Sequence, residues 1–177
     1  MTFEQLEHAI RAACAVAEDP EVIVFGSQAI LGQHRDAHHD LRQSMEADVA
    51  PKNKPERVDY IDGSLGELSP FHETFGFYVH GVSIEAAKLP EGWEERMVKV
   101  ETDQTKGVGW CIEGHDLAAS KLAAFRDKDR EYVRVLLREN YIDAEVLTQR
   151  IRTLDIEEEL RGRILKWIEL TARELNA

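Results

Sequence analysis

Two acidic residues spaced two apart, Glu46 and Asp48, lie in a short run at residues 45–49 that predicts a β-strand stopped by Pro51. Side chains two residues apart on a strand point to the same face, so the two carboxylates should converge. Such a pair is destabilised by repulsion unless a cation lies between its members. Mg²⁺ fits this role, because proteins bind it through one or two carboxylates together with substrate phosphates. The alternative is an edge strand with a solvated acidic face.

A glycine followed by a serine, Gly26-Ser27, comes directly after the apolar run at residues 22–25, which is typical of a buried strand. A glycine at this point lets a ligand approach the backbone closely, because no Cβ intervenes. If a helix begins here, its first N–H groups favour an anion, and the serine hydroxyl adds a donor for a phosphate oxygen. The alternative is a tight turn without a ligand.

Basic residues gather in the segment after His115. Apolar residues at helical spacing predict one long helix from there to about residue 138. Lys121 and Lys128 are seven apart and would share one face of that helix. The basic side chains are either paired with acidic neighbours along the helix or form a place for phosphates in an otherwise acidic chain. They are Lys121, Arg126, Lys128, Arg130, Arg134 and Arg138.

These segments resemble those of a known superfamily. Residues 25–32 (Phe-Gly-Ser-Gln-Ala-Ile-Leu-Gly) and 44–49 (Ser-Met-Glu-Ala-Asp-Val) resemble the signature of the DNA polymerase beta-like nucleotidyltransferases. Residues 116–122 and 126–129 look like the Lys…Arg-x-Lys-Asp segment of minimal bacterial nucleotidyltransferases. These include abortive-infection toxin-type proteins and a related family of undetermined function. The resemblance covers roughly residues 22–133.

The resemblance implies site residues. It implies that Gly26, Ser27, Gln28, Lys121 and Lys128 bind a nucleoside triphosphate, and that Glu46 and Asp48 bind Mg²⁺. The implied catalytic residues are Glu46, Asp48, Glu85 and Asp129. The chain departs from the pattern at Glu46, where the family usually has aspartate, and at Gln28, where many members have a basic residue. Glu85 is the best candidate for a third acidic residue, and Asp62 is another.

The activity that the resemblance implies is transfer of a nucleotidyl group from a nucleoside triphosphate to a hydroxyl of RNA, a protein or a small molecule. The context that it implies is a toxin–antitoxin or phage-defence component with an antitoxin-like partner protein. The alternative is a non-catalytic nucleotide-binding or partner-binding module that keeps the fold.

The order of expected elements indicates an α/β (α+β) fold, with a nucleotidyltransferase-like mixed sheet flanked by helices. A capping box at Thr2 and Gln5 opens the first helix, and Asp143 should cap a helix in the tail. A second capping box, Asp155 with Glu158, should open the last helix. We expect one nucleotidyltransferase-like domain at residues 1–139 and a C-terminal helical extension at 140–177 packed on it. Further strands are expected at residues 77–85, 96–101 and 108–113.

Composition sets limits on the function. The chain has 177 residues, which suits one domain with an extension. Its net charge of −12 argues against binding duplex DNA through a broad face. It contains no apolar run long enough for a bilayer and no secretion signal at its start, so we expect a cytoplasmic protein without membrane contact. Cys14 and Cys111 have no paired metal or redox spacing and should be buried thiols.

Two histidine-containing segments remain open. The polar stretch at residues 33–43 places His34 and His38 at helical spacing, but three protein ligands in defined geometry are needed for a catalytic zinc site. We therefore predict a loop there. His80 lies within the strand expected at residues 77–85, and the sequence does not fix which face of the sheet it occupies.

Overall fold

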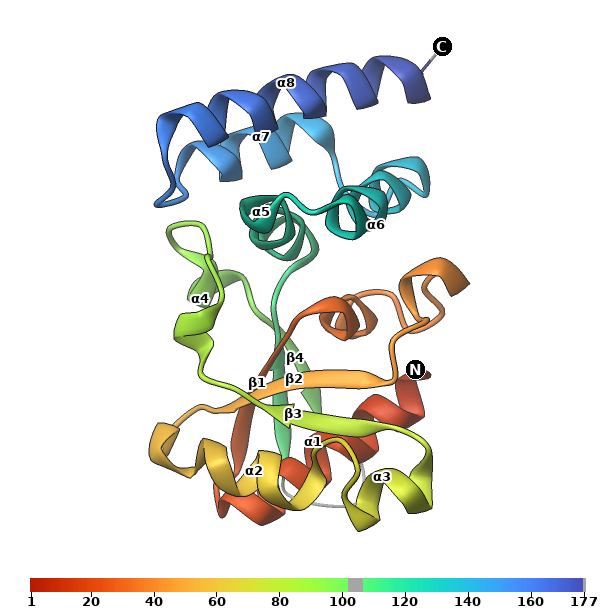
Figure 1. Ribbon diagram of the computed structural model, residues 1–177, viewed down its shortest axis with the longest axis vertical. Helices are drawn as coiled ribbons and strands as arrows, with labels where there is room; N and C mark the ends of the chain where they lie inside the picture. The colour runs from red at the N-terminus through yellow and green to blue at the C-terminus, as the bar shows by residue number, and fades with distance from the viewer. Residues whose placement is uncertain (102–106, 177) are drawn as a thin grey trace.

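The computed structural model describes residues 1–101 and 107–176. Its strands are β1 (Glu21–Phe25), β2 (Glu46–Pro51), β3 (Tyr78–Gly81), β4 (Val98–Glu101) and β5 (Val108–Cys111). They form one mixed sheet in the order β3-β2-β1-β5-β4 (Figure 1). β1 pairs antiparallel with β2 and parallel with β5, β2 is parallel to β3, and β4 is antiparallel to β5. The expected α+β fold with a mixed sheet is confirmed.

One face of the sheet is apolar and covered by helices. α1 (Phe3–Ala17) begins at the expected capping box of Thr2 and Gln5. It lies against the sheet beside α2 (Val58–Leu65) and α3 (Pro70–Phe75) (Figure 1). Ala47 and Val49 of β2 are fully buried on this side. Because side chains alternate along a strand, Glu46 and Asp48 must occupy the opposite face.

The opposite side of the sheet faces the remaining helices, which stack above it in Figure 1. The 3₁₀ helix η1 (Ser27–Gly32) follows β1, and its Ile30 and Leu31 are fully buried. The α-helices of this side are α4 (Trp93–Arg96), α5 (Gly114–Ala124), α6 (Asp127–Arg138), α7 (Ala144–Arg152) and α8 (Glu158–Leu175). Short 3₁₀ turns are η2 (His39–Leu41), η3 (Pro55–Arg57) and η4 (Ile84–Ala86).

The prediction of a single long helix at residues 115–138 is wrong, because the structure has two helices there, α5 and α6. The break is at Phe125, which adopts a left-handed conformation with φ of 52° and caps α5. Its ring packs against the guanidinium groups of Arg130 and Arg163. Lys121 and Lys128 therefore lie on different helices. Their separation of seven residues does not place them on one helix face.

The expected strand at residues 77–85 is also shorter in the structure, since β3 ends at Gly81 and η4 follows. In the tail, Asp143 caps α7 as expected. The capping box of Asp155 and Glu158 does not form, because α8 begins at Glu158 after Glu157, which makes no side-chain cap.

A buried carboxylate ties the C-terminal helices to the rest of the fold. Asp116 in the first turn of α5 has no exposed surface. It accepts two hydrogen bonds from the guanidinium of Arg96 in α4, at 2.8 and 3.1 Å. Its other neighbour is Arg150 of α7, whose Nε lies 3.2 Å from the carboxylate. This carboxylate thus connects α4, α5 and α7.

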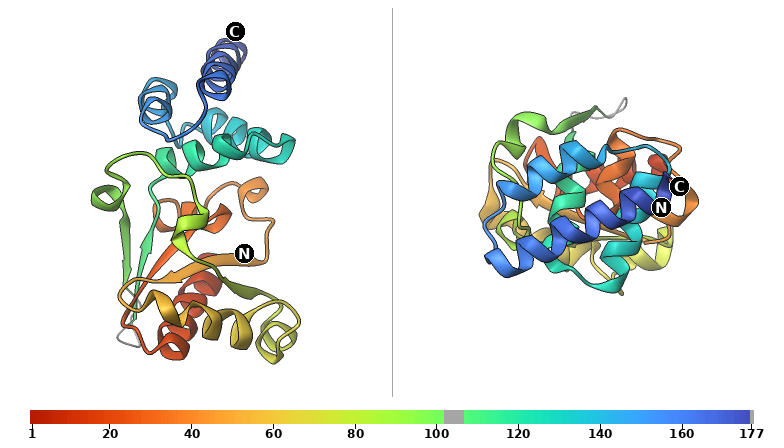
Figure 2. Two further views of the ribbon diagram at one scale, coloured as in Figure 1. Left: turned by 60° about the vertical axis from the view of Figure 1, so that its left-hand side comes forward. Right: turned by 90° about the horizontal axis from the view of Figure 1, so that it is seen from above.

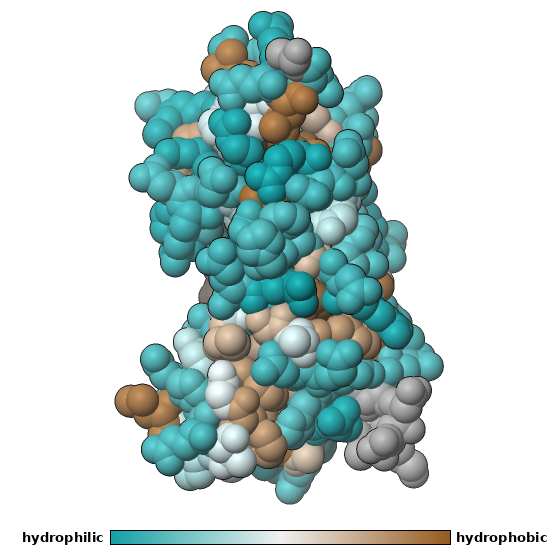
Figure 3. All heavy atoms as spheres, turned by 90° about the vertical axis from the view of Figure 1, so that its right-hand side faces the viewer, coloured by the Kyte–Doolittle hydropathy of each residue, from teal (hydrophilic) through white to brown (hydrophobic). Residues whose placement is uncertain are grey.

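The layered arrangement gives the molecule an elongated outline. In Figure 2, α7 and α8 form the outermost layer, beyond α5 and α6. Figure 3 shows hydrophobic side chains gathered over the sheet half of one face, while the C-terminal helices are mostly hydrophilic there. Leu68, between α2 and α3, is 82% exposed. No described helix is long and apolar enough to cross a bilayer. Both cysteines are buried and free, as expected.

The turn after β1 depends on a glycine. Gly26 has φ of 66° and ψ of −166°, a backbone region that only glycine occupies without strain. A Cβ atom placed there would lie 1.9 Å from Oδ2 of Asp48 on the neighbouring strand. The missing side chain therefore lets the Asp48 carboxylate approach the chain where β1 ends.

We predict that Gly26→Ala lowers the free energy of unfolding by about 1–3 kcal/mol, because alanine meets both the strained backbone and the Asp48 carboxylate. Denaturant unfolding measures this change. Gly162→Ala in α8 is the matched control: its new Cβ meets nothing within 4 Å, so it should stabilise the helix by about 0.5–1 kcal/mol. A Gly26→Ala protein as stable as the wild type would contradict the close approach.

Candidate active site

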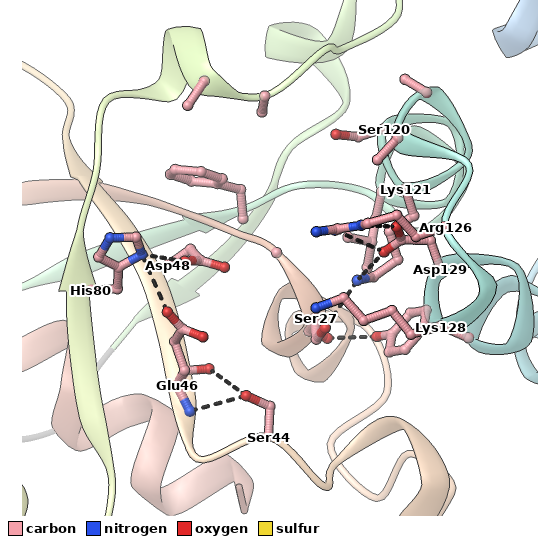
Figure 4. A pocket seen from close by; sticks show the side chains of 18 of the residues that line it. Ser27, Ser44, Glu46, Asp48, His80, Ser120, Lys121, Arg126, Lys128 and Asp129 are labelled. Atoms are coloured by element: carbon pink, nitrogen blue, oxygen red, sulfur yellow. Dashed lines mark hydrogen bonds and ion pairs between the residues drawn. The ribbon is translucent and has the colours of Figure 1, made fainter. Parts of the chain in front are cut away.

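Glu46 and Asp48 of β2 and His80 of β3 form one side of the candidate site, which we call the acidic wall. In the sheet register Asp48 lies beside Phe25 of β1 on one side and beside His80 of β3 on the other, so these side chains share a face. Nδ1 of His80 lies 2.9 Å from Oδ1 of Asp48 and 3.2 Å from Oε1 of Glu46 (Figure 4). Because β2 is flanked by β1 and β3, the alternative of an edge strand with a solvated acidic face does not apply.

The ionisation of this wall follows from burial and mutual repulsion. Partial burial and then the charge of Asp48 raise the pKa of Glu46 above its usual value. Burial alone would lower the pKa of His80, but the hydrogen bond that its ring donates to Asp48 and the charges of Asp48 and Glu46 outweigh burial and raise that pKa. The raised pKa of His80 indicates that the two carboxylates stabilise positive charge at this point.

A second wall faces the first across the Gly26-Ser27 turn. Nζ of Lys121 in α5 donates a hydrogen bond of 2.9 Å to Oγ of Ser27. Its ammonium also lies 4.3 Å from the centre of the Tyr132 ring, and the Tyr132 hydroxyl donates to the carbonyl of Ser27. Burial lowers the pKa of Lys121, although Asp129 and Asp48 partly oppose this. An anion in front of Ser27 would therefore stabilise the charged ammonium.

The first turn of α6 completes this basic wall. Asp129 is 2% exposed and holds Arg126 through two hydrogen bonds, of 2.6 Å to Nε and 3.2 Å to Nη2. The same carboxylate lies 3.9 Å from Nζ of Lys121. Lys128 points toward the space between the two walls (Figure 4). Asp129 thus holds basic side chains of both α5 and α6 in position.

Between the two walls lies a cleft of about 700 Å³, a volume suited to a small-molecule ligand. Carboxylates and an imidazole line one side of it, and a serine hydroxyl, an ammonium and a guanidinium line the other. The first set suits a divalent cation, and the second suits phosphate oxygens. A metal–nucleotide complex has both of these requirements.

The structure brings most of the predicted site residues to this cleft. Those that line it are Gly26, Ser27, Glu46, Asp48, Lys121, Lys128 and Asp129. Gln28 does not line it: its side chain is fully buried as the second residue of η1, and its amide lies near the carbonyl of Leu41.

Glu85 is also not brought to the acidic pair. β3 ends at Gly81, and the chain then turns into η4, where Glu85 lines a separate hollow with Trp93 and Trp110. The expectation that Glu85 supplies the third acidic residue therefore has no support in this geometry. Asp62, the other candidate, lies on the exposed surface of α2 and acts on His80 only through its charge.

His80 is the site residue that sequence reasoning missed. Its position in the predicted strand was clear, but its face was not. The signal that fixes it is the parallel register of β2 and β3, which sets His80 directly beside Asp48. Tyr132 is a second missed residue, because only the packing of α6 beside the Gly26-Ser27 turn brings its hydroxyl to the carbonyl of Ser27.

The donor atoms of Glu46, Asp48 and His80 all lie within 4.8 Å of one another. Oxygen and imidazole nitrogen donors at this spacing fit a divalent metal ion. The close packing of Asp48 against Gly26 points its carboxylate toward the same place. The side chains present are thus compatible with a bound divalent cation.

Comparison with known proteins agrees with this geometry. A family model described as a nucleotidyltransferase of unknown function (DUF6036) matches residues 1–174. No curated protein and no solved structure matches the chain. Since the match extends over nearly the whole sequence, the chain belongs to this family of nucleotidyltransferases of undetermined function.

Proposed function

We propose that this protein transfers a nucleotidyl group from a nucleoside triphosphate to a hydroxyl group. The observation that carries the proposal is the cleft itself, in which a cation-binding wall at Glu46 and Asp48 faces an anion-binding wall at Ser27 and Lys121. In the reaction, the acceptor oxygen forms a bond to the α-phosphorus, and its hydroxyl proton passes to solvent. The bond from that phosphorus to the bridging oxygen breaks, and pyrophosphate leaves with the electron pair.

The basic wall would hold the triphosphate. Ser27 accepts a hydrogen bond from Lys121, so its own hydroxyl hydrogen can donate to a phosphate oxygen. Lys121 and Lys128 act as point charges, and Arg126 offers the guanidinium N–H groups that do not donate to Asp129. Charge that develops on the pyrophosphate would be stabilised from this side.

The acidic wall would hold the divalent cation, and Mg²⁺ is the ion that two carboxylates and phosphates favour. When bound, such an ion polarises the phosphoryl oxygens and neutralises their charge. Glu46 and Asp48 would orient it at the start of β2. Gly26 leaves the space that lets Asp48 do so.

A second candidate function is a non-catalytic nucleotide-binding or partner-binding module. It is favoured by one observation: among residues 1–101 and 107–176, the group that meets the acidic pair contains His80 and no third carboxylate. Without a base, the acceptor hydroxyl would keep its proton. Incubation with labelled nucleoside triphosphates, Mg²⁺ and total cellular RNA separates the two functions.

In that experiment, the label should appear on an acceptor and pyrophosphate should be released. Label on RNA, on a protein or on a small molecule identifies the acceptor class. Label on a protein partner would favour the proposed toxin–antitoxin or phage-defence role in the cytoplasm. Nucleotide binding without any transfer would support the non-catalytic module and reject the enzyme.

We predict that Mg²⁺ with a nucleoside triphosphate raises the melting temperature, because a ligand that binds only the folded state stabilises it by mass action. At about 100 times the dissociation constant the gain is about 2.7 kcal/mol. Asp48→Asn should abolish this shift and lower transfer about 100-fold or more. Without ligand it should melt near the wild-type temperature, since the carboxylate repulsion is relieved.

The control for this variant is Asp36→Asn, at an exposed position outside the cleft. It should keep both the thermal shift and the transfer activity. An Asp48→Asn protein that unfolds without ligand would mean that the pair is structural. A wild-type protein that shows no shift at millimolar ligand would count against a nucleotide site.

We also predict that Lys121→Met weakens nucleotide binding by about tenfold or more, because it removes a charge-assisted contact worth roughly 1.5–3 kcal/mol. Methionine keeps most of the packing of the lysine stem, so the melting temperature should change little. Lys166→Met on α8, whose side chain is exposed and does not line the cleft, is the control. Isothermal titration with a nucleoside triphosphate measures both. Unchanged affinity in Lys121→Met would remove this residue from the site.

A further inference from the structure

We infer that His80 is a direct ligand of the metal ion held by Glu46 and Asp48, so that this site selects Mn²⁺ over Mg²⁺. The inference rests on the proposed function for what the ion does in the reaction. That an ion binds here is argued from the donor atoms alone. It concerns one property of the acidic wall, the identity of its third donor. A nitrogen donor in that position changes which divalent cation the site prefers.

The distances between the donor atoms support a shared ligand sphere. Two donors at neighbouring positions of an octahedron, each about 2.1 Å from the ion, are about 3.0 Å apart. Nδ1 of His80 lies 2.9 Å from Oδ1 of Asp48 and 3.2 Å from Oε1 of Glu46. His80 therefore has the spacing to each carboxylate that neighbouring ligands of one small ion require.

The backbone fixes His80 in this place. β2 and β3 run parallel, with Asp48 beside His80 and Val49 beside Gly81. A Cβ atom at Gly81 would clash with the backbone of α2, at 2.4 Å from the carbonyl oxygen of Val58. The close contact of α2 with the strand therefore holds the register, and the imidazole faces the carboxylates (Figure 4).

The chemistry of the donors decides the preference. Mg²⁺ binds oxygen ligands and accepts nitrogen poorly, whereas imidazole is a good ligand for first-row transition metals. Like Mg²⁺, Mn²⁺ prefers octahedral coordination and binds carboxylates. A set of two carboxylates and one imidazole therefore suits Mn²⁺. A set of three carboxylates would instead suit Mg²⁺.

Another account of the same contacts is that the His80 imidazolium serves as a counter-ion of the pair, with no metal. A second group of potential ligands also exists at η2, formed by His38, His39 and Asp40. That group is less suited, because His39 is largely exposed and the guanidinium of Arg138 lies 3.6 Å from the Asp40 carboxylate. A cation already faces that carboxylate.

The test uses the full-length protein after removal of metal by a chelator. Titration of Mn²⁺ alone, followed by electron paramagnetic resonance, gives its dissociation constant, and competition with Mg²⁺ gives the second constant. We expect wild type to bind Mn²⁺ at least about tenfold more tightly than Mg²⁺. Pulsed electron paramagnetic resonance of the bound Mn²⁺ should show coupling to one imidazole nitrogen. This signal can be measured on the wild-type protein alone.

Two substitutions at one position separate the accounts. His80→Gln removes the nitrogen donor, so it should lose the nitrogen coupling and weaken Mn²⁺ binding at least about tenfold. His80→Asp supplies a third carboxylate, so it should bring the two dissociation constants to near parity. His39→Gln is the matched control and should keep both the affinity and the nitrogen coupling.

Three outcomes would overturn the inference: equal affinity of wild type for the two ions, a nitrogen coupling that survives in His80→Gln, or one that disappears in His39→Gln. These outcomes are separate from the fate of the proposed function. Failure of nucleotide binding alongside nitrogen-coupled Mn²⁺ would reject the nucleotide site alone. Nucleotidyl transfer with an ion that shows no nitrogen coupling would reject the role of His80 alone.

Discussion

The packing of one carboxylate against two neighbouring strands holds the candidate site together. Asp48 lies against the backbone of Gly26, just after β1, where no Cβ could fit, and its other side contacts His80 on β3. The position of this carboxylate is therefore set by the pairing of β2 with both neighbours. A shift of either register by one residue would move a side chain of the wall to the opposite face.

The positive charges beside the cleft would allow an acidic protein to bind a polyphosphate. The chain carries a net charge of −12, yet the basic wall gathers Lys121, Arg126 and Lys128 around one turn. Lys121 is mostly buried, so water screens its charge less than it would at the surface. Asp129 neutralises part of this charge and in return fixes the positions of Arg126 and Lys121. The basic side chains that face the cleft are thus held in fixed positions.

Much of the fold could be predicted because its signals are local. The capping box at Thr2, the apolar run before Gly26 and the spacing of Glu46 and Asp48 each depend on a few consecutive residues, and all appear in the structure. The break at Phe125 could not be predicted, because neither glycine nor proline marks it. The packing of its ring on Arg130 and Arg163 is a tertiary effect that periodicity does not contain.

The members of the site that sequence reasoning missed or misplaced have a similar cause. The face of His80 depends on the register between β2 and β3, which no single strand specifies. The sequence pattern predicts a strand that continues to Glu85 and so places this residue at the site, but the strand ends at Gly81. Gln28 follows Ser27 directly and still points into the core, because a 3₁₀ helix turns each side chain well away from its neighbour.

The order of the strands in the sheet has a consequence for the way the chain folds during synthesis. The acidic wall comes from β2 and β3, and the glycine turn from β1, all within the first half of the chain. Lys121 and Asp129 come after β5 in the sequence. β5 pairs with β1 across a long sequence separation, with Val108 of β5 beside Glu21 of β1. Closing so long a loop is the slow part of forming such a sheet. A ribosome-bound chain therefore exposes its paired carboxylates before the basic wall exists, and it gains the complete cleft only when α5 and α6 have emerged.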